Sequence, residues 1–162
     1  MLLIFTLIAT LFAQCPLQKT SLKEISLIDT TTIPNLIEQG KGCITLVELW
    51  ASWCGTCQHT KPKILSIVKQ YPTIAYLPIS ADYRRGPLKK YLKHHNMSEG
   101  HYLLNRWTLA GLAEAFQQKD AQFQDAIPLL LLYDQNGTLL YQATEPKDLS
   151  SLRQKIQKLI QP

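Results

Sequence analysis

Apolar residues occur along this chain in two patterns, short strand-like blocks and longer stretches with helical spacing. The strand-like blocks are residues 43–50 (CITLVELW), 73–79 (TIAYLPI), 128–133 (PLLLLY) and 138–142 (TLLYQ). The first block is apolar on both faces, which is typical of a buried central strand. The last two flank Asp134-Gln135-Asn136-Gly137, a strong hairpin signal.

Helical spacing appears between and after these blocks. It begins beyond Cys57 and recurs over residues 87–95, 108–119 and 146–160. Pro62 should kink the first helix, and Pro146 should open the last one. The last helix has an apolar stripe at Leu149, Leu152, Ile156, Leu159 and Ile160. With a further strand and helix expected within residues 23–39, the order predicts an α/β fold, a mixed central sheet with helices on both faces.

The first thirteen residues (MLLIFTLIATLFA) form an uncharged apolar run. As a helix they would span about 20 Å, too short for a hydrocarbon core of about 30 Å. This length suits a secretory signal, with the small Ala13 before the cut, although no Lys or Arg precedes the run. We therefore expect a signal peptide over residues 1–14, one domain over 15–162 and a periplasmic location. The less favoured alternatives are a lipid or uncleaved anchor near Cys15, and a buried N-terminal element of a cytosolic protein.

The formal charge is +5, and a large share of the positive charge lies between residues 84 and 95. Such a cluster is able to meet nucleic acid or an anionic membrane. Leu88, Tyr91 and Leu92 alternate with the charges at helical spacing, so we favour a solvated helix face. An exported protein has little nucleic acid to meet, and we expect no nucleic-acid partner.

Cys54 and Cys57 stand two residues apart where a buried strand is followed by a helix. At a helix N-terminus, unpaired N–H groups and the helix dipole favour a thiolate and lower the pKa of the first thiol. We therefore expect Cys54 to attack a disulfide as the nucleophile and Cys57 to resolve the mixed disulfide.

Other uses of a Cys-x-x-Cys pair fit less well. A zinc site needs four ligands, and the four histidines form no recognisable array with the pair. Attachment of a c-type haem needs His directly after the second cysteine, where this chain has Gln58. We expect no metal and no cofactor; a purely structural disulfide stays possible.

Glu48 is an acid inside the predicted buried strand, where desolvation of its charge is costly. Six residues before Cys54, it would lie behind the motif and exchange a proton with Cys57 as the disulfide opens. The alternative is that Glu48 points outward at a sheet edge or pairs with a lysine.

The segment VELWASWCGTC, residues 47–57, resembles the active-site segment of the thioredoxin superfamily. Pro62 matches the family's helix proline, Glu48 its buried acid, Ile127-Pro128 its cis-proline and Gly137 its hairpin glycine. The longer stretch 96–126 resembles the exported TlpA and ResA branch, where an extra helix precedes the cis-proline strand. The chain also resembles the DsbH type of periplasmic disulfide reductase.

This resemblance implies a thioredoxin-like fold in which Cys54 attacks and the substrate backbone docks beside Trp53, Gly55, Thr56, Ile127 and Pro128. It further implies disulfide-containing exported proteins as substrates, a DsbD-like membrane protein as electron donor and action as a monomer. One departure is the lack of the family's glycine before the last helix, in Gln142-Ala143-Thr144-Glu145. A charged Glu145 at that rim would alter the choice of partner.

The direction of the reaction depends on the two residues between the cysteines, Gly55 and Thr56. Oxidants often stabilise the thiolate with a histidine there, which favours the reduced protein. Its absence favours a reductase of protein disulfides. The alternatives are a reductase of apocytochrome cysteines before haem attachment, and a non-catalytic adaptor or copper chaperone. Cys43 is expected to be a small buried residue; whether it pairs with Cys15 stays open.

Overall fold

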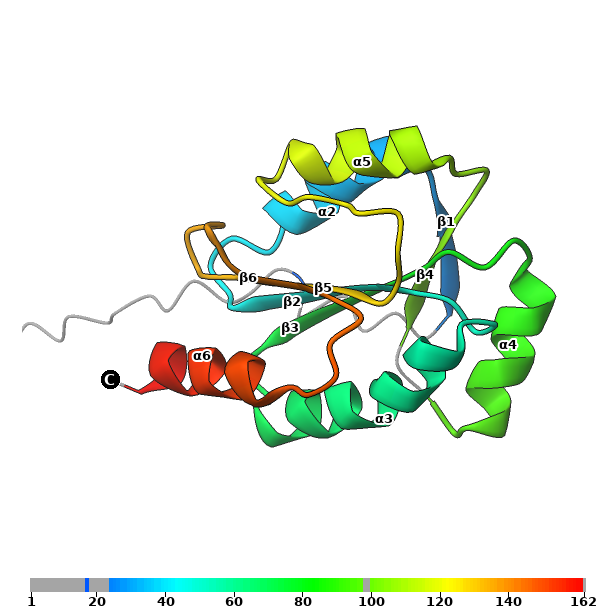
Figure 1. Ribbon diagram of the computed structural model, residues 1–162. Coiled ribbons are helices and arrows are strands. Elements are labelled where there is room, and N and C mark those ends of the chain that lie inside the picture. The colour runs from blue at the N-terminus through cyan, green and yellow to red at the C-terminus, as the bar shows by residue number, and fades with distance from the viewer. Residues whose placement is uncertain (1–16, 18–23, 98–99, 162) are drawn as a thin grey trace, which may run out of the picture.

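The computed structural model describes residue 17 and residues 24–97 and 100–161 of the chain (Figure 1). Five α-helices and six strands lie within these residues. In chain order the elements are β1 (Ile25–Ile28), the 3-10 turn η1 (Thr30–Thr32), α2 (Ile33–Glu38), β2 (Thr45–Trp50), α3 (Gly55–Gln70), β3 (Ala75–Ser80), α4 (Arg85–His94), β4 (His101–Leu104), α5 (Leu109–Gln117), β5 (Leu129–Tyr133), β6 (Leu139–Thr144) and α6 (Ser150–Ile160).

The strands form one mixed sheet in the order β1-β4-β3-β2-β5-β6. The first four strands in that order are parallel, while β5 is antiparallel to both β2 and β6. The predicted central strand is β2, in which all six residues are buried. It pairs with β3 on one side and β5 on the other, so its carboxyl end lies near the middle of the sheet.

Helices cover both faces of the sheet, as the sequence predicted. Right-handed crossovers place a helix on one face or the other according to the direction in which the chain moves across the sheet. The chain moves from β1 to the parallel strand β2 in one direction, and α2 lies on one face (Figure 1). Helix α5, which precedes the antiparallel β5, lies on the same face as α2 (Figure 1). The chain moves from β2 to β4 in the other direction, and α3 lies on the opposite face together with α6 (Figure 1).

Two large apolar clusters fill the space between the helices and the sheet. One packs α3 and α6 on β2 and β5 through Ile64, Ile67, Leu130, Leu152 and Ile156, among others. The other contains both cysteines of the pair together with residues of β2, β4, α2, α4 and α5. The dithiol segment therefore rests on the core.

The β5–β6 hairpin forms at the predicted turn. The Asp134 carboxylate accepts backbone N–H bonds from Asn136 and Thr138 at 2.8 and 2.9 Å. Gly137 has φ +82°, a conformation that favours glycine. Both features match the hairpin signal in the sequence.

Three sequence predictions need correction. Strand β4 lies within residues 96–126, where we expected only an added helix. Helix α6 begins at Ser150 and not at Pro146. Its last apolar residue, Ile160, is 39% exposed and does not belong to the buried stripe, because the final turn of the helix extends past the strands (Figure 1).

Helix α4 carries the basic cluster, and its burial pattern supports the solvated-face interpretation. Leu88 and Leu92 are buried, while Lys89, Lys90 and Lys93 are exposed. Most of the charge in the cluster thus faces solvent.

The edge strand β6 is held to the segment after α5. The side-chain amide of Gln142 accepts from the backbone N–H of Gln122 at 2.9 Å and donates to its carbonyl at 2.6 Å. Where β6 ends, Glu145 has φ +47°, and its N–H donates to the Pro128 carbonyl at 2.9 Å. The backbone at Glu145 therefore has a conformation that glycine adopts more readily.

Candidate functional site

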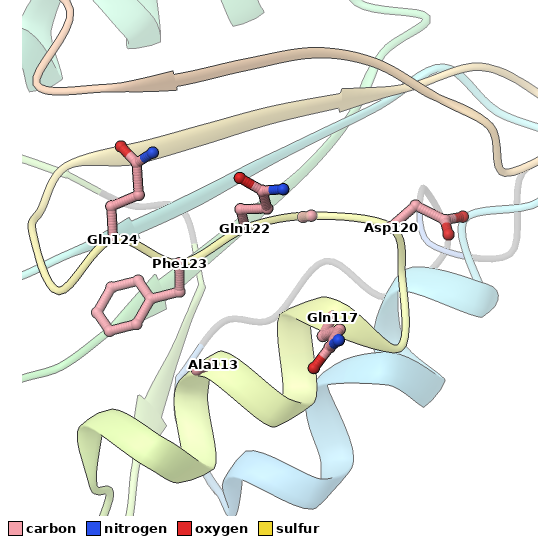
Figure 2. Close-up of a pocket in the computed structure, with 7 residues that line it drawn as sticks. Ala113, Gln117, Asp120, Gln122, Phe123 and Gln124 are labelled. Carbon is pink, nitrogen blue, oxygen red and sulfur yellow. The ribbon is translucent and has the colours of Figure 1, made fainter.

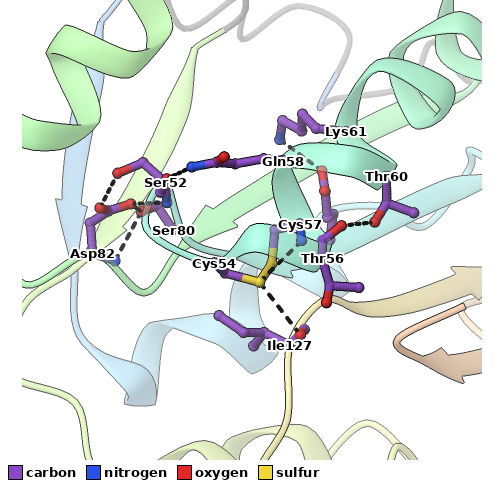
Figure 3. The surroundings of a disulfide bond; sticks show 11 residues. Ser52, Cys54, Thr56, Cys57, Gln58, Thr60, Lys61, Ser80, Asp82 and Ile127 are labelled. Atoms are coloured by element: carbon purple, nitrogen blue, oxygen red, sulfur yellow. Dashed lines mark hydrogen bonds and ion pairs between the residues drawn. A yellow bond between two sulfur atoms is a disulfide. The ribbon is translucent and has the colours of Figure 1, made fainter.

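Cys54 and Cys57 form a disulfide at the carboxyl end of β2, where α3 begins (Figure 3). Cys54 is the N-cap of α3, and its sulfur accepts a bond from the backbone N–H of Cys57 at 3.1 Å. Cys54 is 9% exposed and Cys57 is fully buried. An incoming sulfur atom can therefore approach Cys54 but not Cys57.

The Ile127–Pro128 peptide bond is cis, as the sequence predicted. The Ile127 carbonyl oxygen lies 3.6 Å from Cys54 Sγ (Figure 3). Pro128 is buried and Ile127 is partly buried, whereas Gly55 and Thr56 are exposed. The structure thus brings the outer sulfur next to the exposed first turn of α3 and to a backbone segment 73 residues further along the chain.

Glu48 is fully buried and forms an ion pair with an equally buried lysine, Lys61. The Lys61 Nζ lies 2.7 Å from Glu48 Oε2 and donates to the Tyr76 hydroxyl at 2.8 Å. Tyr76 also donates to Glu48 Oε2. The ammonium lies 3.9 Å from the centroid of the Trp50 ring, a cation–π contact. Glu48 is therefore buried, as we expected, but it also pairs with a lysine, which was the alternative interpretation.

Lys61 and Tyr76 are site residues that the sequence analysis missed. Lys61 stands four residues after Cys57 and three before Ile64 on one stripe of α3, and both of those residues are buried. A lysine within an apolar stripe, close in sequence to a buried acid, was the available signal. Tyr76 pairs with Leu46 in the β2–β3 register, two positions from Glu48. Only the register of the strands reveals this.

Asp82 is a second buried acid, and it joins the loop after β2 to the loop after β3. Its carboxylate accepts the Ser52 backbone N–H at 2.9 Å, the Ser52 hydroxyl at 2.5 Å and the Ser80 hydroxyl at 2.7 Å (Figure 3). The Ser52 carbonyl in turn accepts from Gln58 Nε2 at 2.6 Å. Because Ser52 lies two residues before Cys54, these bonds fix the approach of the chain to the dithiol. The sequence analysis did not single out Asp82.

Trp53 is 53% exposed and stacks on Tyr83, with ring centroids 6.0 Å apart and planes inclined by 12°. Tyr83 is itself 77% exposed. Two large aromatic side chains thus border the dithiol at the surface.

A cavity of about 580 Å³ lies between α5 and the segment that follows it (Figure 2). Its described lining residues are Ala113, Gln117, Asp120, Ala121, Gln122, Phe123 and Gln124. Asp120 is the only ionisable group among them. None of these lining residues contacts the dithiol in the interactions described above. The dithiol is therefore the site with nucleophilic chemistry.

Cys43 is buried, as expected, and its sulfur is disulfide-bonded. Cys15 and the predicted signal peptide, residues 1–14, lie outside the described residues. Within the described part of the chain, no helix has both the length and the apolar character needed to cross a bilayer.

Comparison with known proteins agrees with this geometry. Residues 27–91, which include the dithiol, match the thioredoxin family model. A curated relative, the thioredoxin-like protein R548 of Acanthamoeba polyphaga mimivirus, is 30% identical over 66 residues, which is 40% of this chain and 46% of the relative. The chain thus spans less than half the length of this curated relative.

Several solved structures of bacterial proteins have the same fold. A thiol:disulfide interchange protein of the thioredoxin family from Chlorobium tepidum has a TM-score of 0.60 at 18% identity, covering 75% of this chain and 82% of that one. A secreted Mycobacterium tuberculosis disulfide oxidoreductase, homologous to E. coli DsbE, has a TM-score of 0.55 at 15% identity, covering 74% of this chain and 84% of that one. At these identities the likeness establishes the thioredoxin-like fold.

Proposed function

We propose that this chain is an exported thiol–disulfide oxidoreductase that reduces disulfides in client proteins. The observation that carries the proposal is the placement of the pair, with Cys54 Sγ at the N-cap of α3 and Cys57 buried behind it. A thiolate at that position receives the Cys57 N–H bond and the favourable end of the helix dipole.

The reaction has two steps that balance. The Cys54 thiolate attacks one sulfur of a client disulfide, the client S–S bond breaks, and the other client sulfur leaves as a thiolate. The Cys57 thiolate then attacks Cys54 Sγ, which closes the Cys54–Cys57 disulfide and releases the second client thiolate. Two electrons pass from the protein to the client, and the released thiolates take up the two protons that the cysteines lose.

Glu48 is the proposed proton partner of Cys57 in the second step. Cys57 must lose its proton in the interior, because its side chain is fully buried. In the described residues Glu48 is a buried carboxylate whose Oε1 has no hydrogen-bond partner, so it retains a free acceptor site. Lys61 and Tyr76 hold the other oxygen in place.

The two residues between the cysteines favour reduction of client disulfides over their formation. Gly55 and Thr56 are exposed and carry no imidazole to stabilise the Cys54 thiolate further. Continued turnover then needs an electron donor, for which a DsbD-like membrane protein is our candidate. The docking region for the client comprises Trp53, Gly55, Thr56, Ile127 and Pro128.

Insulin reduction with dithiothreitol as electron donor tests the activity. We expect wild type to accelerate precipitation of the insulin B chain, and Cys54→Ser to abolish the acceleration. An unchanged rate in Cys54→Ser would refute Cys54 as the nucleophile. The reduction potential tests the direction: about −270 mV, as in thioredoxin, supports a reductase, and about −120 mV, as in DsbA, refutes it.

Export is tested separately. The apolar N-terminal run is the motivation, and the secreted M. tuberculosis structure shows that this fold occurs in an exported protein. Mass spectrometry of the protein from a periplasmic fraction should give a chain that lacks residues 1–14. An intact chain in the cytosol would refute the proposal of export.

A further inference from the structure

Three aromatic rings form a row that leads away from the dithiol. Trp53 stacks on Tyr83, and Tyr83 stacks on Trp107 with centroids 5.7 Å apart and planes inclined by 19°. We call these three residues the aromatic row. Trp53 is 53% exposed and Tyr83 is 77% exposed. Tryptophan side chains are on average highly buried in proteins, and tyrosine side chains are intermediate.

The backbone beneath the row is fixed by buried hydrogen bonds. Asp82 binds the N–H and hydroxyl of Ser52, and these two residues directly precede Tyr83 and Trp53. Trp107 Nε1 donates to the Ala81 carbonyl at 3.1 Å. Rings held in this way lose little conformational freedom when a partner binds, which favours their use as a docking surface.

Arginines surround the far end of the row. A cavity of about 470 Å³ there is lined by Arg84, Arg85 and Arg106 together with Tyr83, Trp107 and the exposed Leu27. All three arginines are exposed. We call this the arginine cavity.

Few acids offset this charge. Asp82 is buried and engaged by Ser52 and Ser80. Asp29 accepts from Asn105, a residue that lines the cavity, at 3.5 Å. The chain has no Asp or Glu from Tyr83 to Met97. The arginine cavity therefore has a surplus of positive charge beside an apolar and aromatic surface.

We propose that the aromatic row and the arginine cavity together bind an acidic polypeptide segment of the client that also carries aromatic or apolar side chains, next to the disulfide under attack. The inference rests on the proposed function, because the row begins at Trp53, the neighbour of the nucleophile Cys54. Carboxylates in the segment match the planar, bidentate donors of the arginines. Its apolar side chains match the exposed rings.

The position of the row favours a polypeptide over single-stranded nucleic acid, which also stacks on aromatic side chains beside arginines. A ligand that follows the row reaches Cys54 at one end. Only a ligand that carries sulfur there makes use of that placement.

The test measures attack of the reduced protein on short cysteine peptides joined by a disulfide to 5-thio-2-nitrobenzoate. The Cys54 thiolate attacks the peptide sulfur, and the coloured thionitrobenzoate anion leaves with the electron pair. Two peptides are compared, and both contain the same tyrosine. The acidic peptide carries Asp and Glu beside it, and the neutral peptide carries Asn and Gln at the same positions. At low ionic strength we expect the acidic peptide to react about tenfold faster, within the range of electrostatic steering.

The triple variant Arg84→Gln/Arg85→Gln/Arg106→Gln should reduce this preference to less than about twofold, while the rate with the neutral peptide stays unchanged. Tyr83→Ala should slow both peptides. The matched control is Lys69→Gln/Lys155→Gln/Lys158→Gln, which removes the same charge from exposed positions on α3 and α6 and should keep the preference.

The outcomes separate the two proposals. If neither peptide reacts faster with wild type than with Cys54→Ser, the proposed function itself fails. If both peptides react equally, or if the control triple variant loses the preference as well, the docking surface is refuted while the function stands. If an oligothymidylate suppresses the reaction more strongly than a free acidic peptide without cysteine, the surface is a nucleic-acid site and the inference is overturned.

Discussion

Lys61 and Glu48 form an ion pair in which neither side chain is exposed, between α3 and the central strand β2. Removal of one partner from a buried pair leaves an uncompensated charge, whereas removal of both is often tolerated. The structure therefore makes Lys61 a residue on which both stability and chemistry depend.

Lys61→Met should lower the free energy of unfolding of the oxidised protein by about 3–5 kcal/mol, because it strands the Glu48 carboxylate. The double variant Lys61→Met/Glu48→Gln should recover most of this loss. Urea unfolding of wild type, Lys61→Met, Glu48→Gln and the double variant forms the complete double-mutant cycle. Additive losses in the double variant would contradict coupling between the two residues.

Glu48→Gln should slow release of the client from the mixed disulfide more than it slows the first attack. The amide cannot take the Cys57 proton, so the second step should depend on bulk hydroxide and rise with pH more steeply than in wild type. Stopped-flow measurement of the two steps across pH provides the test. An unaltered pH dependence of Cys57 reactivity would eliminate proton transfer by Glu48, and a uniform change in both steps would indicate a structural role alone.

Asp82→Ala should destabilise the protein by about 2–4 kcal/mol, because it leaves the buried Ser52 N–H and the Ser80 hydroxyl without an acceptor. It should also increase the mobility of Trp53, which can be followed by tryptophan fluorescence anisotropy in a Trp50→Phe/Trp107→Phe background. Asp82→Asn keeps one carbonyl acceptor, so its stability and its Trp53 anisotropy should lie between those of Asp82→Ala and wild type. Equal anisotropy in all three proteins would contradict the role of Asp82 in holding the loop.

Glu145→Gly should raise the free energy of unfolding by up to about 1 kcal/mol, since glycine adopts a positive φ without steric cost. Glu145→Ala removes the charge but keeps the strained backbone, so it should give no comparable gain. Thermal unfolding of the three proteins distinguishes the two effects. An equal gain in stability in Glu145→Ala and Glu145→Gly would show that the effect comes from loss of the carboxylate.

The sequence predicted the fold well where pattern and chemistry agree. β2 is apolar except for Thr45 and Glu48, and the 134–137 turn carries its own hydrogen-bonding residues, so both were predictable from local sequence. The dithiol and the cis bond at Ile127–Pro128 followed from motifs. Strand β4 was missed because HYLL is only four residues long and its alternation is too short to distinguish from a loop.

The partners of Glu48 were harder to predict because they depend on how elements meet. Lys61 reaches Glu48 across the α3–β2 interface, and Tyr76 reaches it through the register of β2 with β3. Asp82 and Ser52 are 30 residues apart and meet only because their strands are neighbours in a parallel sheet. Such contacts are properties of topology and not of any one segment.

The Gln122–Gln142 pair has a consequence for how the edge of the sheet meets other polypeptide chains. A sheet edge with open N–H and C=O groups templates the addition of further strands, the route by which chains aggregate. Gln142 lies in edge strand β6, and its amide holds the backbone of Gln122 against that strand. Partly unfolded chains offer many candidate strands, and the contact between Gln142 and the Gln122 backbone impedes their capture by the sheet.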